Sequence, residues 1–313
     1  MLHLRVISPA ATTGSVLRVL EEEPGATHLV VLRGVAQAPA GDVVEAAVAR
    51  ESADEVIAAL CALGIDRTGA ITLEQIDTAL SDAADRAEEL APGDAADAVV
   101  WQELVARSGE ESRLNVTFLA FLAIACLLAA VGVITDSAVT IVGAMVVGPE
   151  FGPLAAIAVG LVLRRWDLIR RATIAVAVGF PLAMLVTAGG AALGSWANLF
   201  EAGVLRGRHS VDFVYQVGWW SLIVAVLAGA AGMLSMTSTK SAALVGVFIS
   251  VTTVPAAGYA AVAAILGEWP RFFQSVGQLV VNLIGIVLSA TAVLLLRKGS
   301  WRVVDGGRPL SAG

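Results

Sequence analysis

Residues that build redox, metal or covalent sites are scarce in this sequence. Among 313 residues it holds two cysteines and three histidines. Cys61 falls in a predicted soluble helix and Cys126 in a predicted membrane helix, so a disulfide between them is not expected. The motifs HExxH, GxSxG and GxxxxGK[ST] are also absent. The sequence therefore predicts no enzyme, no cofactor and no metal site, and any pumping would have to use an ion gradient.

Charged residues are few as well, at 15% of the chain, whereas 57% of the residues are hydrophobic and the mean hydropathy is +0.81. Such a balance predicts a polytopic membrane protein. Most acidic residues fall in the first hundred, so the net charge of −7 describes a soluble head. An acidic head argues against nucleic acid as a partner. The chain does not begin with a basic segment followed by an apolar one, so we expect the head to stay in the cytoplasm.

Residues 1–95 predict an α+β ferredoxin-like domain, because strand and helix patterns alternate in the order β–α–β–β–α–β. Strands are expected at Leu2–Ser8, Ala26–Ala36, Asp42–Ala49 and Ala70–Ile76, and helices at Thr13–Glu23 and from Ser52 onward. Such a domain serves packing and assembly in some proteins and senses a small ligand in others, and the pattern leaves both open. Residues 96–114 predict an amphipathic connector helix at the membrane surface.

Six apolar stretches follow, each about 20 residues or longer and therefore long enough to cross a bilayer. They are Asn115–Thr135, Ser137–Leu163, Ala172–Ala197, Val211–Thr237, Ser241–Leu266 and Gln274–Arg297. Together they predict an α-helical transmembrane domain at 115–300, followed by a cytoplasmic tail at 301–313. Basic residues gather after the second, fourth and sixth stretches, which predicts an inner-membrane protein with both termini in the cytoplasm.

The two halves of this domain, 115–197 and 211–297, resemble each other at an offset of 103 residues. The offset aligns Leu163 with Leu266 and Trp166 with Trp269. Because each half holds three spans, the second half would enter the membrane from the opposite side, which predicts a 3+3 inverted repeat. At the same offset GPEFGP in span two falls beside VTTVPA in span five, so both spans are predicted to be broken helices.

Broken helices at membrane depth point to a binding site. An unsatisfied peptide group in lipid costs several kcal/mol, so irregular backbone is tolerated where protein or a water-filled cavity surrounds it. We therefore expect a small solute or ion to bind near the midplane between the two breaks, beside freed carbonyls and half-helix N-termini. The candidate binding residues are Gly148, Pro149, Glu150, Gly152, Thr252, Thr253, Pro255 and Asn282.

Among these residues, Glu150 is the strongest indication of a binding site. An acidic side chain at the centre of a membrane helix costs on the order of 3 kcal/mol, so it should face a partner or water. It could bind a cation, carry a proton, or be held neutral by a carbonyl freed at the break. Thr252 and Thr253 occupy the corresponding place in the second half, where their hydroxyls could face Glu150 or bond to their own helix. Asn282 could join the site or serve as a polar contact between helices.

A resemblance to a known family is carried by SAVTIVGAMVVGPEFGPLAAIAVGL (137–161), SAALVGVFISVTTVPAAGYAA (241–261) and Asn282. These segments resemble prokaryotic hydrophobic membrane proteins catalogued as domain of unknown function 389, roughly from Asn115 to Leu296. The resemblance implies the same architecture with a small cytoplasmic head and leaves the substrate open. Relatives commonly carry serine or alanine where Gly148 stands and an aliphatic or acidic residue where Glu150 stands. A role for Glu150 therefore rests on this sequence and not on the resemblance.

Two functions remain open at this point. The breaks and the buried acid favour a transporter or channel for a small solute or ion, with the head gating or assembling the complex. A membrane-anchored sensor or assembly scaffold without transport is the alternative, and it does not require paired breaks. Runs of small residues in spans three and four suit close helix contacts, and we expect a homo-oligomer in the lipid bilayer.

Overall fold

The computed structural model divides the chain into two compact units, Met1–Glu103 with Trp301–Gly313, and Leu104–Ser300. The residues it describes are 1–76, 78–91, 98–201, 203–205, 218–237 and 253–305, the last seven of them by backbone alone.

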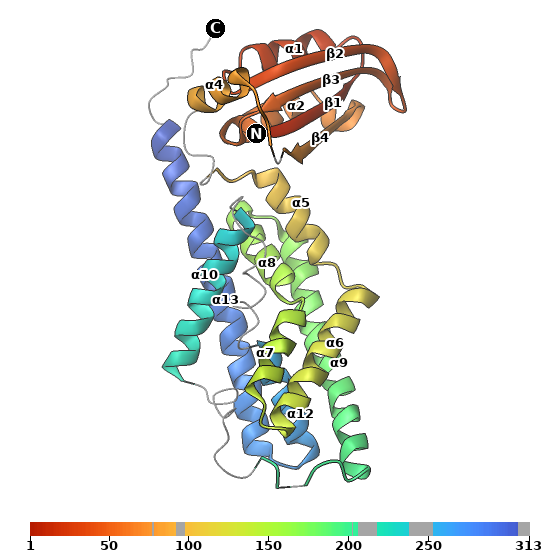
Figure 1. The fold of residues 1–313 in the computed structure, drawn as a ribbon, viewed down its shortest axis with the longest axis vertical. Coiled ribbons are helices and arrows are strands. Elements are labelled where there is room, and N and C mark those ends of the chain that lie inside the picture. The colour runs from red at the N-terminus through yellow and green to blue at the C-terminus, as the bar shows by residue number, and fades with distance from the viewer. Residues whose placement is uncertain (77, 92–97, 202, 206–217, 238–252, 306–313) are drawn as a thin grey trace. The chain divides into compact units, whose positions relative to one another are not determined.

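The first unit holds a four-stranded antiparallel sheet, which confirms the predicted α+β head (Figure 1). Its strands are β1 (Leu2–Ser8), β2 (Ala26–Gln37), β3 (Ala40–Val48) and β4 (Ala70–Gln75), in the spatial order β2-β3-β1-β4. Its helices are α1 (Thr13–Glu21), η1 (Arg50–Ser52), α2 (Ala53–Ala62), α3 (Ile65–Thr68) and α4 (Asp82–Leu90). The element order contains the expected β–α–β–β–α–β pattern, whereas α4 was not expected.

One face of the sheet carries the core of the head. Alternate residues of β1 point to that face, and Leu4 and Val6 are fully buried there. They pack with Val16 and Leu20 of α1 and with Leu60 of α2. Apolar residues recur every two positions in the strand and about every four positions in the helices. The sheet and the helices therefore each have one apolar face, and these faces pack against each other.

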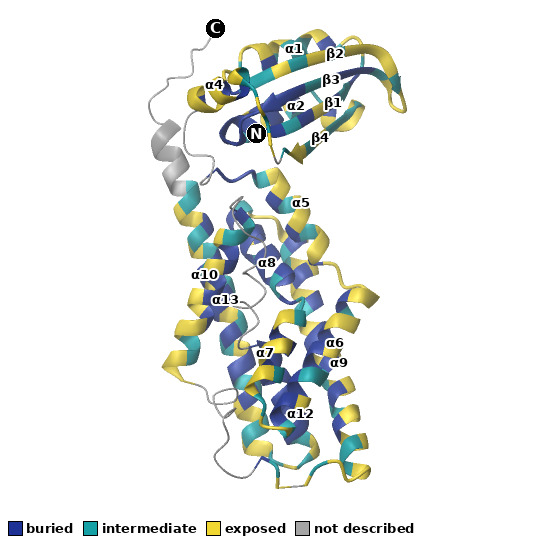
Figure 2. Cartoon of the chain, in the orientation of Figure 1, coloured by how far each residue is buried: buried dark blue, intermediate teal, exposed yellow. Residues whose placement is uncertain are grey.

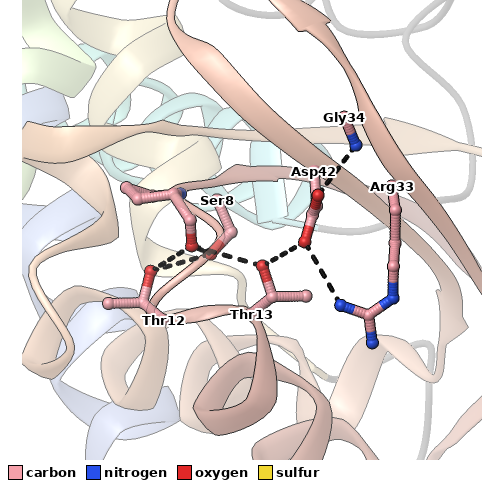
Figure 3. A network of polar contacts seen from close by, with 7 residues as sticks. Ser8, Thr12, Thr13, Arg33, Gly34 and Asp42 are labelled. Carbon is pink, nitrogen blue, oxygen red and sulfur yellow. Dashed lines mark hydrogen bonds and ion pairs between the residues drawn. The ribbon is translucent and has the colours of Figure 1, made fainter.

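The head also buries a carboxylate, Asp42 of β3, which is 3% exposed (Figure 3). Its Oδ1 accepts a hydrogen bond from the Gly34 N–H at 2.8 Å, and its Oδ2 accepts one from Thr13 Oγ1 at 2.8 Å. The Arg33 guanidinium lies 3.7 Å from Oδ2. The Gly34 N–H, then the Thr13 hydroxyl, hold the pKa of Asp42 below its usual value. Both oxygens are thus satisfied within the fold.

The connector helix α5 (Trp101–Glu111) begins against the head. The carboxylate of Asp54 accepts a hydrogen bond from the Trp101 N–H at 3.0 Å, which satisfies one of the unpaired N–H groups at the start of α5. The buried Arg50 pairs with Glu103 at 3.1 Å. Burial raises the pKa of Asp54 to about 6, although the Trp101 N–H opposes that rise.

The second unit is helical. It holds α6 (Val116–Ile134), α7 (Ala138–Val147), α8 (Phe151–Leu163), α9 (Trp166–Trp196), α10 (Trp219–Thr237), α12 (Thr253–Ile265) and α13 (Trp269–Asp305). Four of these, α6, α9, α10 and α13, are long and apolar enough to cross a membrane, and α7 with α8 forms a fifth candidate bent by 52°. Membrane helices are therefore confirmed. Residues 211–217 and 241–252 of predicted spans four and five lie outside the described part of the chain.

Two helices extend beyond their predicted spans. α9 begins at Trp166 instead of Ala172, and α13 begins at Trp269 instead of Gln274 and continues past Arg297. A hydropathy window detects the segment that lipid surrounds, but a helix continues through charged residues such as Arg170 and Arg171, which are good helix formers.

Burial separates the outer helices from the inner ones (Figure 2). α6, α9, α10 and α13 each leave large apolar side chains exposed, as lipid-facing helices do. By contrast α12 is buried from Thr253 through Ala263. Gly258 allows this, because a Cβ there would lie 2.8 Å from the Ala129 Cβ and 2.9 Å from the Cys126 carbonyl oxygen of α6. α12 therefore runs through the interior of the unit.

Contacts along the helices fix their directions. Gly179 faces Phe118 and Gly190 faces Leu127, so α6 and α9 run the same way. In the same manner Ser221 contacts Asn282 and Gly229 contacts Ile286, so α10 and α13 run the same way.

The two pairs run in opposite directions. Phe272, near the start of α13, shares a core cluster with Ala191, near the end of α9. Towards the end of α13, Lys298 Nζ donates to the Val162 carbonyl at 3.4 Å, just before α9 begins.

Candidate functional site

The break in the second predicted span lies between α7 and α8. Pro149 disfavours helical backbone at the residue before it, and Gly148 is accordingly extended, with φ −66° and ψ 127°. Glu150 returns to helical geometry and begins α8, whose first bond runs from the Leu154 N–H to the Glu150 carbonyl at 3.4 Å. The glutamate therefore sits at the N-terminus of a new helix instead of at the side of a continuous one.

Glu150 meets Thr253 at the start of α12. Thr253 Oγ1 donates to Glu150 Oε1 at 2.6 Å, and both side chains are fully buried. Of the two alternatives for Thr253, the structure therefore selects the bond that faces Glu150. The second carboxylate oxygen, Oε2, is buried as well, and none of the residues that the structure describes bonds to it. A buried charged oxygen without a bond is costly, and such groups gather at functional sites.

Two helix N-termini meet at this contact. Glu150 precedes the first residue of α8 and Thr253 is the first residue of α12, and the two helices lead away from the contact in opposite directions (Figure 1). Pro153 and Pro255 each stand third in their helix, where an N–H has no partner within the helix anyway. These prolines therefore start the two half-helices instead of interrupting them. We call this meeting point, formed by Glu150, Thr253 and the first turns of α8 and α12, the junction.

Glycine flanks the junction because there is no room for a side chain. A Cβ on Gly148 would overlap Glu150 Oε2 and lie 2.8 Å from Val254 Cγ2. A Cβ on Gly152 would lie 2.6 Å from the Glu111 Cβ at the end of α5. The φ of Gly148 is ordinary, so its glycine is required by space and not by backbone strain.

A cavity of about 360 Å³ opens beside the break. Gly148, Pro149 and Gly152 line it from the break, and the remaining wall comes from the end of α5 and the first turns of α6. Those wall residues are Glu110, Glu111, Arg113, Asn115, Thr117, Phe118 and Phe121, and Phe151 at the start of α8 completes the lining. Glu111 is paired with Arg107 at 3.3 Å, which leaves Glu110 and Arg113 as opposite charges on the same wall. The lining of the cavity is mostly apolar with a few charged and polar groups, and its net charge is therefore close to zero.

A larger groove of about 700 Å³ lies between α9 and α13, but its lining is almost entirely apolar. Phe180 and Met184 face it from α9, and Leu283 and Val287 face it from α13. A polar solute would find few groups there to fix its orientation. The smaller cavity beside the break is the better candidate.

The structure does not bring every predicted site residue to the junction. The amide oxygen of Asn282 accepts from Ser221 Oγ at 3.0 Å and from Gln278 Nε2 at 3.4 Å, in the interface of α10 with α13. That placement suits a contact between helices. Thr252 lies outside the described residues. Gly148, Pro149, Glu150, Gly152, Thr253 and Pro255 surround the two helix starts.

Sequence reasoning missed the wall that faces the break. Glu111 and Arg113 precede the first span, and their charge marked them as surface residues of the connector. Nothing in a single sequence indicates that the end of α5 packs on Gly152, because that contact depends on the tertiary fold. Ser221 could have been suspected as a partner, since it is a hydroxyl in the apolar stretch next to the span of Asn282.

Comparison with known proteins adds a family match over the site. The model of a family described as a domain of unknown function, DUF389, matches residues 145–288, which include the break, α12 and Asn282. An uncharacterized protein of Methanocaldococcus jannaschii, MJ0678, is 24% identical over 197 residues. These residues are 62% of this chain and 58% of that protein, so the match spans little more than half of its length. No solved structure matches the chain.

Proposed function

This chain belongs, through residues 145–288, to the family described as domain of unknown function DUF389, and since that description assigns no activity, we propose a function from the geometry of the junction. The protein is a membrane transporter or channel for a small solute or ion. The solute binds at the junction, between the half-helices α8 and α12. The soluble head, taken to be cytoplasmic, regulates or assembles the complex.

The helix boundaries support an internal repeat. Val116 and Ile134 bound α6, and Trp219 and Thr237, each 103 positions later, bound α10. α9 begins at Trp166 and α13 begins 103 positions later, at Trp269. α12 begins and ends 102 positions after α8. Two helix pairs thus repeat the offset at which the two halves of the sequence align, and the third differs from it by one residue.

Contacts repeat at the same spacing. Phe118 packs against Gly179 between α6 and α9, and 103 positions later Ser221 bonds to Asn282 between α10 and α13. Because these two pairs of helices run in opposite directions, the two halves would be related by a two-fold axis in the membrane plane. Six spans in an inverted 3+3 arrangement follow from this reading.

The proposed axis explains why Glu150 contacts Thr253. The two residues are 103 positions apart, which is the offset of the sequence alignment and one more than the offset between the starts of α8 and α12, and they touch. Positions of two halves that are equivalent to within one residue touch each other only where they lie close to the axis that relates the halves. In transporters built from inverted repeats the binding site lies at this interface, formed by the ends of discontinuous helices. The buried contact between Glu150 and Thr253 is the single observation that carries the proposal.

The cavity beside the break gives a solute a route towards the junction. The cavity beside Gly148 lies against the first turns of α6, on the side of the connector helix. Gly148 lines this cavity and also lies next to Glu150 Oε2, since any side chain at Gly148 would overlap that oxygen. With the N-terminus in the cytoplasm, the cavity would admit a solute from the cytoplasmic side.

Reconstitution tests the proposal. The purified full chain is placed in liposomes, and the movement of ions, protons and small solutes is recorded under imposed gradients. We expect at least one of them to move through the wild-type protein, and the variant Glu150→Gln to change the rate or its pH dependence while eluting as the same folded species. Asp136→Asn is the matched control, because Asp136 is an exposed acid in the turn after α6. If the wild-type protein moves nothing under any gradient, the scaffold alternative gains.

A further inference from the structure

The charges at the junction bear on what kind of solute it accepts. A helix N-terminus carries roughly half a positive charge, from N–H groups that have no partner within the helix. α8 and α12 are each 13 residues long, and both begin at the junction. Together they place about one positive charge there. Anions are the usual ligands of such helix ends.

The negative charge that matches these helix ends belongs to the protein itself. The Glu150 carboxylate lies between the two N-termini with Oε1 bonded to Thr253. Its Oε2 is fully buried and has no bond from any described residue, so it marks a position where a further group is required. A cation at this point would add to the positive ends of two helices. A second anion would be repelled for as long as Glu150 is ionised.

We propose, building on the transport function above, that the junction binds a small monovalent anion together with a proton. The proton adds to the carboxylate of Glu150, the neutral side chain gives up its place as the counter-charge of the two helix ends, and the anion takes that place. When the anion leaves, the proton leaves with it. One H⁺ and one A⁻ move in the same direction, so the cycle is electrically neutral.

Other titratable and charged groups near the junction leave this balance intact. α6 contributes Cys126, and α12 contributes Tyr259. The end of α5 and the turn after it contribute Glu110, Glu111 and Arg113, of which Glu111 is paired with Arg107. Of the two arginines, Arg107 is paired with Glu111 and Arg113 shares the cavity wall with Glu110, and neither bonds to Glu150, so the helix N-termini remain its counter-charge.

Anion uptake into proteoliposomes tests the inference, with chloride, nitrate and formate as probes. For the wild-type protein, an inside-alkaline gradient of about one pH unit should drive about tenfold anion accumulation, because one proton accompanies each anion. An imposed membrane potential should have no effect on the wild type. Glu150→Gln cannot take up the proton, so its anion flux should follow the potential and ignore the pH gradient. Asp136→Asn should behave as the wild type does.

The possible failures are distinguishable. If Glu150-dependent flux of sodium or potassium appears and none of the three anions moves, the anion assignment is overturned while the transport function stands. If Glu150→Gln still couples anion uptake to the pH gradient, another group carries the proton and the inference is wrong. Glu150→Ala provides a second neutral variant, with Asp136→Ala beside it, in case the glutamine variant does not fold. If no species moves through the wild type, the inference and the proposed function fail together.

Discussion

Three carboxylates are buried in the described part of the chain, Asp42 and Glu51 of the head and Glu150 of the membrane unit. Of these, Asp42 and Glu150 each accept a hydrogen bond from a threonine. Asp42 has a further bond from the Gly34 N–H and an arginine nearby, so the fold supplies every partner it needs (Figure 3). Glu150 has its threonine at 2.6 Å and no described bond to its other oxygen. The same local contact therefore occurs once in a complete network and once in an incomplete one.

This difference in hydrogen bonding distinguishes a carboxylate that stabilises the fold from one that serves a function. A fully bonded buried carboxylate stabilises the fold, because removing it strands its partners. An incompletely bonded one costs stability, and chains keep such groups where a ligand or proton completes them. We therefore expect variants of Asp42 to change the unfolding of the head, and variants of Glu150 and its neighbours to change solute movement.

Gly148→Ala should have the largest effect on flux. The added Cβ would overlap Glu150 Oε2, and overpacking of this kind costs about 1–3 kcal/mol, enough to shift the carboxylate and to slow flux by about tenfold or more. Gly143→Ala is the control, since a Cβ there meets nothing within 4 Å. Flux assays on both variants in liposomes provide the measurement. Equal rates for the two variants would show that the space beside Glu150 has no role.

Asp42→Ala should act on the head. It leaves the Gly34 N–H and the Thr13 hydroxyl without their acceptor. Hydrogen–deuterium exchange of the full chain should then show faster exchange in peptides of β2 and β3, with peptides of α8 and α12 unchanged. Glu45→Ala, which removes a half-exposed acid of the same strand, is the control. Protection as in the wild type would mean that the network in Figure 3 contributes nothing to stability.

Thr253→Val removes the one hydrogen bond that the carboxylate of Glu150 accepts from another described side chain. Losing a hydrogen bond to a buried charged group costs about 1.5–3 kcal/mol, so flux should fall by roughly tenfold. Thr187→Val is the matched control, because Thr187 is equally buried and its hydroxyl bonds to the Ala183 carbonyl of its own helix. Should both valine variants transport alike, Thr253 would be a packing residue.

Asp54 is a half-buried carboxylate of the head, and its pKa is raised to about 6. Since the folded state then binds more protons than the unfolded state between about pH 4 and 6, the stability of the head should fall as the pH rises through that window. Solvent screens a half-buried group, so we expect a loss of about 1–2 kcal/mol. Hydrogen–deuterium exchange of peptides from the head, recorded on the full chain at a series of urea concentrations and pH values, measures it.

Asp54→Asn should flatten this dependence while keeping an acceptor for the Trp101 N–H. Asp66→Asn replaces a more exposed acid of the head and should leave the pH dependence of stability unchanged. A wild-type head whose stability rises between pH 4 and 6 would contradict the sign derived for Asp54.

Much of the fold follows from short-range patterns. Alternating residues in Leu2–Ser8 and the apolar length of Val116–Ile134 each report directly on the surroundings of the backbone, so the strands and long helices are predictable. α4 was not predicted because its buried face consists of Ala84 and Ala87, which give little hydrophobic signal. Its cap is visible in the sequence, since Ser81 accepts from the Ala83 and Ala84 N–H groups.

The junction was only partly predictable. A carboxylate in an apolar run singled out Glu150, and the offset of 103 singled out Thr253. That the two side chains bond depends on α12 packing against α6 and α9, which a single sequence does not encode in any local pattern. The pairing of Asn282 with Ser221 depends on tertiary packing in the same way.

A double-mutant cycle on flux tests most directly whether Glu150 and Thr253 form one site. Rates are measured for the wild type, Glu150→Gln, Thr253→Val and the double variant in the same liposome preparation. Our account predicts that the double variant is no slower than Glu150→Gln alone, a coupling of about 0.5–3 kcal/mol. Losses that simply add would show that the two residues act independently, and the shared site at the junction would have to be abandoned.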